Sequence, residues 1–189
     1  AIDGPEKEGL EIPGETDLMA VFDAVKKMKI TPYEDVVLDK PLFETIPTPS
    51  KVITEDHTEE LGVTEWTLEN GVRIILKPTD FKNDEVLFSA RSPGGSSLVD
   101  DNKYVAAMTA TSVIKEAGIG QFNQIELDKM LAGKIARVNP YIGGIEEGFN
   151  GSASPQDLET LFQLIHLYFS APRLDSSAFL AYQERMNGF

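Results

Sequence analysis

The stretch Trp66-Thr67-Leu68-Glu69-Asn70-Gly71-Val72-Arg73-Ile74-Ile75-Leu76 decides the fold of this chain. Apolar residues alternate with polar ones on both sides of Asn70-Gly71, which is the pattern of strands that bury one face. Asn-Gly between two alternating runs indicates a tight turn, because both residues tolerate a positive φ. The stretch therefore predicts an antiparallel hairpin over residues 63–76.

The residues that follow predict a third strand and two helices. The strand covers 86–90 and ends at the turn-forming stretch Ser92-Pro93-Gly94-Gly95. A helix from about 101 to 117 is rich in apolar residues on most faces, so we expect it to be largely buried and to stop at Gly118. Its alanines, Ala106 and Ala107, should allow close approach to the sheet, while Val105, Met108 and Ile114 should fill the core. A second, shorter helix begins at Asn123, because Glu126 three residues later completes a capping pair.

The C-terminal third predicts two more strands and two more helices. The strands cover 134–142 and 145–152 and turn at Gly143-Gly144. Ser154-Pro155 is a helix start, with proline at the first helical position. The helix that follows has one apolar stripe, formed by Leu158, Leu161, Phe162, Ile165 and Phe169. Asp175 caps the last helix.

The element order from Val63 is thus βββααββαα, which predicts an α+β fold with a mainly antiparallel sheet and helices packed on one face. Upstream, apolar residues at helical spacing over 18–28 predict one amphipathic helix. Four prolines within 32–49 predict an extended acidic linker. We therefore expect three regions: the end of a preceding domain at 1–31, the linker at 32–62, and an α+β domain at 63–189, truncated at its C-terminal end.

Composition excludes several classes of protein. The 189 residues include 17 Lys and Arg against 31 Asp and Glu, so the net charge is −14. A basic nucleic-acid binder is excluded by this charge, and no apolar run reaches the roughly 20 residues of a membrane span. The chain has no cysteine, so disulfides, thiolate metal sites and cysteine nucleophiles are absent.

The two histidines, His57 and His166, are weak metal candidates. His166 has Phe162 and Ser170 four residues away on either side, so no second ligand shares its helix face, and we expect a core or helix-flank histidine. His57 lies among four acids in a stretch of the linker. Those acids favour the protonated ring, which cannot bind a metal, so a solvated linker histidine is expected.

Other short motifs are read as structural. The stretch Gly118-Ile119-Gly120 follows a helix and lacks the third glycine of a dinucleotide loop. Gly94-Gly95-Ser96-Ser97 follows a strand but has no phosphate-binding lysine, so a turn is expected. The acid pairs Asp84-Glu85, Asp100-Asp101 and Glu146-Glu147 lack the spacing of a calcium loop and are expected at the surface.

The hairpin stretch at 66–76, the strand ending at Gly94-Gly95-Ser96 and the helix after it resemble a domain of the pitrilysin/insulinase family of zinc metallopeptidases. Residues 4–9 through 31–35 resemble the end of the preceding domain and the linker between two halves. In this family the first half carries an inverted zinc motif, H-x-x-E-H, on the helix after the third strand. Placing Gly95-Ser96 on the family's Gly-Ser puts Met108, Thr111 and Ser112 at the motif's His, Glu and His.

None of these three side chains is a competent zinc ligand or base. A downstream acid such as Glu146 would match the third ligand only nominally, because zinc affinity requires the imidazoles. No catalytic, metal-binding or cofactor-binding residue is therefore assigned in this chain, and any zinc, with its activated water and general base, would belong to the catalytic half of a parent protein.

The resemblance implies the linker and first domain of the non-catalytic C-terminal half of a zinc metalloendopeptidase, which helps to enclose the peptide substrate. The segment alone should be inactive. Its implied partners are the catalytic N-terminal half of the same polypeptide and the peptide substrate, and relatives in bacteria suggest a periplasmic or cell-envelope location. Two alternatives remain open: a scaffold or interaction protein of the same fold without peptidase activity, and a free-standing module that binds peptides at an exposed sheet edge.

Overall fold

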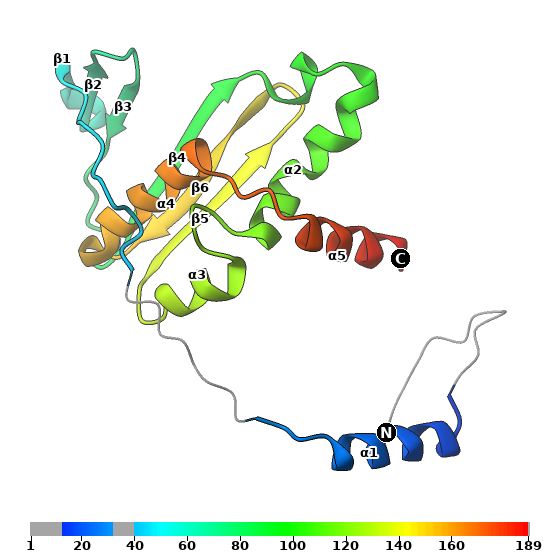
Figure 1. Ribbon diagram of the computed structural model, residues 1–189. Coiled ribbons are helices and arrows are strands. Elements are labelled where there is room, and N and C mark those ends of the chain that lie inside the picture. The colour runs from blue at the N-terminus through cyan, green and yellow to red at the C-terminus, as the bar shows by residue number, and fades with distance from the viewer. Residues whose placement is uncertain (1–12, 32–39, 189) are drawn as a thin grey trace. The chain divides into compact units, whose positions relative to one another are not determined.

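The chain divides into two compact units, residues 1–37 and 38–189. A computed structural model describes residues 13–31 and 40–188, and Figure 1 shows them as coloured ribbon. Residues 4–9 and 32–35, on which part of the family resemblance rests, lie outside the described residues.

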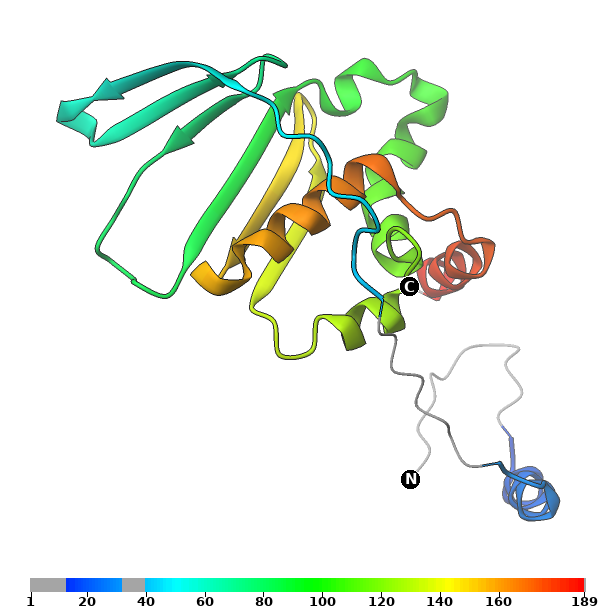
Figure 2. The same ribbon diagram turned by 60° about the vertical axis from the view of Figure 1, so that its left-hand side comes forward.

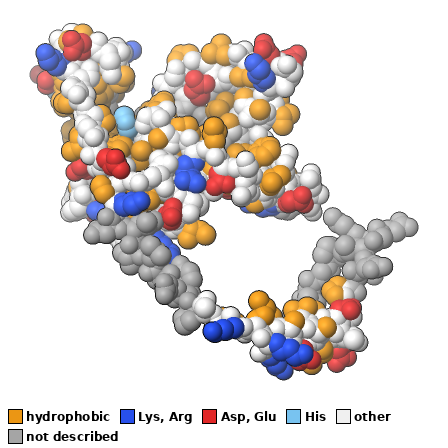
Figure 3. All heavy atoms as spheres, in the orientation of Figure 1, with side chains coloured by type: hydrophobic (Ala, Val, Ile, Leu, Met, Phe, Trp, Pro, Cys, Tyr) orange, Lys and Arg blue, Asp and Glu red, His pale blue; other side chains and the backbone are white. Residues whose placement is uncertain are grey.

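The first unit contains the predicted amphipathic helix, α1 (Glu15–Lys27). Its first turn is capped by the Asp17 carboxylate, which accepts a hydrogen bond from the Gly14 amide at 2.9 Å. Acidic residues occupy the first turn and lysines the last, as the helix dipole favours. Apolar side chains of α1 such as Val21 and Phe22 are exposed, and Figure 3 shows orange side chains on this helix.

The predicted hairpin is confirmed, and it belongs to a three-stranded antiparallel sheet, β1-β2-β3. Strands β2 (Val63–Leu68) and β3 (Arg73–Leu76) pair with Trp66 opposite Ile74. The Leu68 amide donates to the Val72 carbonyl at 2.8 Å, and the turn between them contains Gly71 at a φ of 84°.

An additional strand, β1 (Val52–Thr58), lies in the region where the sequence predicts only an extended linker. It pairs with β2 antiparallel, with His57 opposite Thr64. A short 3-10 helix (Glu59–Leu61) and Gly62, at a φ of 59°, turn the chain between the two strands.

The second sheet has the order β4-β6-β5 and is also antiparallel. It consists of β4 (Val86–Pro93), β6 (Glu146–Ala153) and β5 (Ala136–Ile142). The third predicted strand, β4, therefore pairs with β6 instead of extending the hairpin. The prediction of one sheet is thus refined to two sheets of three strands each.

The second unit also contains four α-helices in its described residues: α2 (Tyr104–Ala117), α3 (Gln124–Met130), α4 (Leu158–Ser170) and α5 (Ser176–Asn187). The order from Val63 is βββααββαα, so the predicted α+β class is confirmed. Figures 1 and 2 both show α4 crossing one face of the β4-β6-β5 sheet. No helix of the described residues has the length and apolar character needed to cross a membrane.

Three helix starts follow from local capping chemistry. The Asn123 side chain accepts from the Glu126 amide at 2.9 Å, and the Glu126 carboxylate accepts from the Asn123 amide. Ser154 precedes Pro155 and accepts from the Asp157 amide at 3.2 Å. Asp175 accepts from the second and third amides of the turn that follows it. All three caps match the prediction because each depends on neighbouring residues only.

The core lies between α4 and the β4-β6-β5 sheet. Its most deeply buried large side chains are Ile119, Phe122 and Leu161. The predicted stripe on α4 is wrong in part, because Phe162 and Phe169 are 51% and 72% exposed. The helix is rotated so that other leucines of the same helix face the sheet, and the two phenylalanines lie at the margins, where they contact Phe88 and Phe149.

The prediction that the helix at 101–117 is largely buried is also wrong. Of α2, only Ala117 is buried, whereas Val105 is 71% exposed and Met108 is 40% exposed. The reason is its position: α2 lies against α5 and the end strand β5, so only its C-terminal part, including Ile114, reaches the core. Ala106 is exposed as well.

Candidate functional site

The turn after β4 is the anchor of the family resemblance, and its geometry is that of a tightly packed corner. Gly95 has a φ of 63°, and a Cβ there would lie 2.4 Å from the Gly143 carbonyl oxygen, so only glycine fits. The Gly95 amide donates to Glu147 Oε2 at 2.9 Å, and the Ser96 amide donates to the Gly143 carbonyl at 2.8 Å. These two amides hold the turn against the β5-β6 hairpin.

The three residues placed on the zinc motif lie together on α2. Met108, Thr111 and Ser112 occupy successive turns of one helix, half-buried or exposed. The nearby hydroxyl of Thr109 donates to the Val105 carbonyl at 2.8 Å, which keeps it within its own helix. Thioether and hydroxyl groups at these positions offer neither an imidazole ligand nor a general base.

The acid considered as a third ligand is engaged elsewhere. Glu146 begins β6, and its Oε1 accepts a hydrogen bond from the Tyr141 hydroxyl at 3.2 Å. Partial burial, followed by the neighbouring Glu146 charge, raises the pKa of Tyr141 above its ordinary value. Across the described residues no group of three or more His, Asp or Glu side chains is arranged to hold a metal ion.

The two histidines lie on different elements. His57 is an exposed residue of β1, and its Nδ1 lies 3.1 Å from the Thr64 hydroxyl of β2. It is therefore a cross-strand residue of the first sheet, while the sequence predicts a linker residue. His166 lies on the outer side of α4, where its ring meets Phe43 edge-to-face at 5.0 Å.

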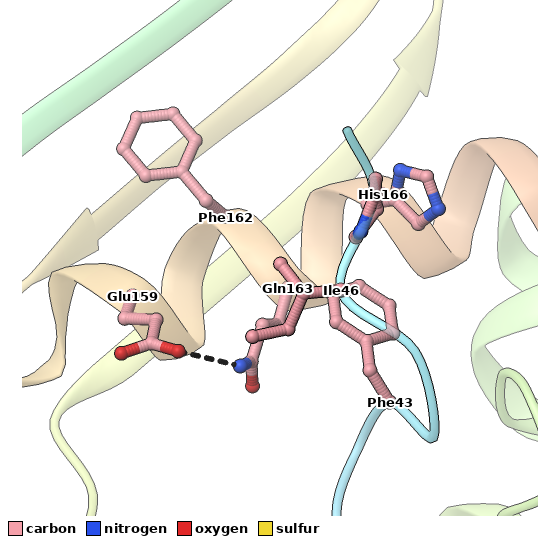
Figure 4. A pocket seen from close by; sticks show the side chains of 7 residues that line it. Phe43, Ile46, Glu159, Phe162, Gln163 and His166 are labelled. Atoms are coloured by element: carbon pink, nitrogen blue, oxygen red, sulfur yellow. Dashed lines mark hydrogen bonds between the residues drawn. The ribbon is translucent and has the colours of Figure 1, made fainter. Parts of the chain in front are cut away.

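His166 contributes to a shallow groove of about 220 Å³ between α4 and the segment 43–47. Figure 4 shows Phe43 and Ile46 beside Gln163 and His166, while the Phe162 ring points away from them; Gln163 Nε2 donates to Glu159 Oε1 at 3.0 Å. The groove is mainly apolar and can receive an apolar side chain. No sequence pattern predicts this groove, because Phe43 and Ile46 lie in a proline-rich stretch without periodicity.

A second, larger groove of about 450 Å³ lies beside β5. Its floor is apolar and contains Leu127, Leu131, Leu164 and Tyr168. Its rim is polar and includes Lys115 and Glu116 of α2. No sequence signal identifies this groove, because it is formed by four elements that are distant along the chain.

The start of β5 is fixed by a carboxylate at the N-terminus of α4. Asp157 Oδ2 accepts hydrogen bonds from the Ile135 amide and the Ser154 hydroxyl, each at 2.9 Å. Lys134 Nζ lies 3.3 Å from the other oxygen. The pKa of Asp157 lies below its ordinary value, chiefly because of the hydrogen bond from the Ile135 amide and then because of the Ser154 hydroxyl and Lys134. This cluster ties the strand to the helix and has the character of a structural clamp.

Two curated relatives of this chain are both named as zinc proteases. No family model matches the chain. It is 28% identical over 141 residues to an Arabidopsis thaliana protein named zinc protease PQQL-like, a match that covers 75% of this chain and 12% of the relative. It is 24% identical over 135 residues to the probable zinc protease PqqL of Haemophilus influenzae, covering 71% of this chain and 15% of the relative. The matched stretch is thus a small part of each relative.

Solved structures of low sequence identity share the fold. The periplasmic protease PqqL from Escherichia coli aligns over 92% of this chain and 19% of its own, with a TM-score of 0.71 and 17% identity. A mutant of the ferredoxin protease FusC, in complex with Arabidopsis ferredoxin, aligns over 93% of this chain and 20% of its own, with a TM-score of 0.66 and 17% identity.

Proposed function

Because the chain is homologous to a part of the PqqL-like zinc proteases, we propose that it is the linker and first domain of the non-catalytic half of a zinc metalloendopeptidase. In this role it helps to enclose the peptide substrate. Zinc, its activated water and the general base belong to the catalytic N-terminal half of the same polypeptide. The segment alone hydrolyses no peptide.

The observation that supports this proposal is the chemistry of α2. The helix follows the Gly94-Gly95-Ser96 corner, where the catalytic half of the family carries its zinc motif, and it presents Met108, Thr111 and Ser112. A thioether and two hydroxyls cannot replace two imidazoles and a carboxylate. The domain therefore keeps the family's fold without the family's metal chemistry.

The test uses the full-length parent protein and separates metal binding from activity. Alanine replacement of Met108, Thr111 and Ser112 together should leave one zinc per polypeptide by elemental analysis. Mutation of the H-x-x-E-H motif in the other half should abolish both zinc content and peptidase activity. Loss of zinc from the triple alanine variant would contradict the proposal. A parent without H-x-x-E-H and without activity would favour the scaffold alternative.

The enclosing role needs a second measurement. Peptide substrate carrying a photoreactive group should label residues of this domain in the full-length, catalytically inactive parent. The matched control is a photoreactive peptide that the active enzyme does not cleave. Labelling confined to the catalytic half would show that this domain does not line the chamber.

A further inference from the structure

We propose that Asn70, in the turn between β2 and β3, is a site of spontaneous modification, where the side-chain amide is lost and the backbone rearranges to isoaspartate. The chain contains three Asn-Gly pairs, which begin at Asn70, Asn150 and Asn187. Asn-Gly is the most reactive context for this chemistry, because glycine has no Cβ to hinder its own amide nitrogen. The fold makes the three pairs unequal, and it leaves Asn70 as the reactive one. This chemistry is independent of the proposed function.

The reaction needs only water, and its atoms balance. The Gly71 amide nitrogen gives its proton to hydroxide and attacks Asn70 Cγ, while the carboxamide nitrogen takes a proton from water and leaves as ammonia. The product is a cyclic imide that joins the two residues. Water then opens the imide at either carbonyl, which gives aspartate or gives isoaspartate, whose main chain runs through the side-chain carbon. One water is consumed and one ammonia is released, and nothing is oxidised or reduced.

The turn at Asn70 is open to solvent and is closed by local bonds. Asn70 and Gly71 are both exposed, and a Cβ built at Gly71 would meet no atom within 4 Å. The Gly71 amide donates to the Leu68 carbonyl at 2.9 Å, and this bond must break to free the nucleophile. Opening of one exposed turn is among the least costly forms of local unfolding. The strands beside it stay paired, because the Leu68 amide donates to the Val72 carbonyl at 2.8 Å.

The carboxamide of Asn70 is held against the backbone that follows it. The Val72 amide donates to Asn70 Oδ1 at 3.1 Å. Oδ1 is the atom that gains negative charge when the Gly71 nitrogen attacks Cγ. A backbone N–H that already points at this oxygen stabilises the charge as it develops. The turn therefore presents the nucleophile, the electrophile and a donor for the oxyanion within three successive residues.

Asn150-Gly151 has the same reactive sequence in a protected place. It lies in β6, the middle strand of its sheet, where Gly151 pairs with Phe88 on one side and Val138 on the other. A Cβ at Gly151 would lie 2.5 Å from the Arg137 carbonyl oxygen, so the backbone has no room to turn toward the Asn150 side chain. Reaction here requires β6 to separate from a neighbouring strand, an opening that approaches unfolding of the unit.

Asn187-Gly188 ends helix α5 and should react at an intermediate rate. The Gly188 amide donates to the Glu184 and Arg185 carbonyls, at 3.2 and 3.3 Å. A helical backbone directs each amide nitrogen along the axis and away from the preceding side chain. The last turn of a helix frays, so this restraint is weaker than the sheet around Asn150.

The consequence falls on the hairpin that the turn closes. Isoaspartate adds one carbon to the backbone of a turn whose ends are bonded at Leu68 and Val72, so the pairing of Trp66 with Ile74 should loosen. Aspartate keeps the backbone length and still offers an oxygen to the Val72 amide. The two products thus separate the effect of the longer backbone from the effect of the added charge.

The test follows each pair separately in the whole 189-residue chain. Trypsin cuts after Lys and Arg and places the three pairs on different peptides, 52–73, 138–173 and 186–189. The folded chain is aged in heavy-oxygen water at mildly alkaline pH, and mass spectrometry measures the conversion of each peptide. Product formed during ageing carries the heavy oxygen, whereas product formed during digestion in ordinary water does not. Methyl transfer by an isoaspartate-specific methyltransferase measures the isoaspartate.

Asn70 should convert at least about a hundredfold faster than Asn150 in the folded chain, with Asn187 between them. In urea the three pairs should convert within about threefold of one another, because the fold no longer restrains them. Leu161→Ala loosens the helix packed on β6 and should accelerate Asn150 at least about tenfold, while Asn70 keeps its rate. Hydrogen exchange over 63–76 should be at least about tenfold faster in the isoaspartate form, and freshly purified Asn70→Asp should match the unaged chain.

The proposal is overturned if the folded chain converts Asn70 no faster than Asn150, or if Asn70 converts in urea and not in the folded chain. Product without isoaspartate, product without heavy oxygen, or unchanged exchange over 63–76 in the isoaspartate form would overturn it equally. If Leu161→Ala does not fold, as judged by circular dichroism, the three pairs of the unaltered chain decide. None of these results bears on the zinc content of the parent, so the proposed function fails or stands separately.

Discussion

Replacing Leu161 with alanine should strongly destabilise the second unit. Leu161 lies on α4 and is 0% exposed. Its Cδ1 packs directly against the β6 backbone, because a Cβ built at Gly151 would lie 3.1 Å away. The substitution removes three carbon groups, which is about 2.4 kcal/mol of transfer free energy at about 0.8 kcal/mol each. Gly151 has no side chain that could fill the space, so the cavity raises the total to about 3 kcal/mol.

Phe162→Ala is the matched control on the next position of the same helix. Phe162 is 51% exposed and meets Phe88 edge-to-face, with ring centroids 5.7 Å apart. Such a pair contributes roughly 0.5–1.5 kcal/mol beyond its buried area. We expect a loss of about 1 kcal/mol, well below that of Leu161→Ala, although phenylalanine is the larger side chain.

Urea unfolding followed by far-ultraviolet circular dichroism measures the free energy of unfolding of both variants. In thermal unfolding of a unit of this size, a loss of about 3 kcal/mol corresponds to a fall in Tm of roughly 6–12 °C. The fluorescence of Trp66 reports the β1-β2-β3 sheet in the same experiment. A loss for Phe162→Ala equal to or greater than that for Leu161→Ala would refute the orientation of α4 on the sheet.

Further outcomes follow from burial, charge and exposure. The folded-state pKa of Asp157 lies below the ordinary value of 3.8, so its contribution to stability is present above that value and is lost as pH falls through the lower folded-state pKa. Asp157→Asn should make stability depend less on pH in this range, as urea midpoints measured from neutral to low pH can show. Ala117→Leu should cost roughly 1–3 kcal/mol by overpacking, whereas the exposed Ala106 should tolerate leucine, as thermal unfolding can show. Limited proteolysis with mass readout should cut the exposed loop 77–85 before the paired strand 52–58. Calorimetric titration of the isolated chain should detect no stoichiometric submicromolar zinc site.

The features predicted correctly from the sequence depend on local chemistry. Asn70-Gly71 sets the hairpin turn, and Asn123, Ser154 and Asp175 start their helices by bonds to amides two or three residues away. Such signals do not require knowledge of distant residues. They are sufficient for the element order βββααββαα and for the α+β class.

The features that were missed depend on long-range pairing. All seven residues of β1 are exposed, so the strand is held by backbone pairing with β2 and leaves no alternating burial pattern to detect. The division into two sheets arises because β4 pairs with β6, some sixty residues later, instead of with its predecessor. The groove beside β5 likewise requires four elements to meet.

The way α2 is anchored explains which of its positions the fold depends on. Its fixed end is the C-terminal one: Arg173 Nε donates to the Ala117 carbonyl at 3.0 Å, and Ile119 and Phe122 beyond the helix are almost completely buried. Gly118, at a φ of 87°, lies so close to the Phe122 carbonyl that no side chain fits. Met108 and Ser112 lie farther up the helix and are exposed, so their side chains contribute little to the core. Substitutions at these two positions should therefore cost the fold little stability.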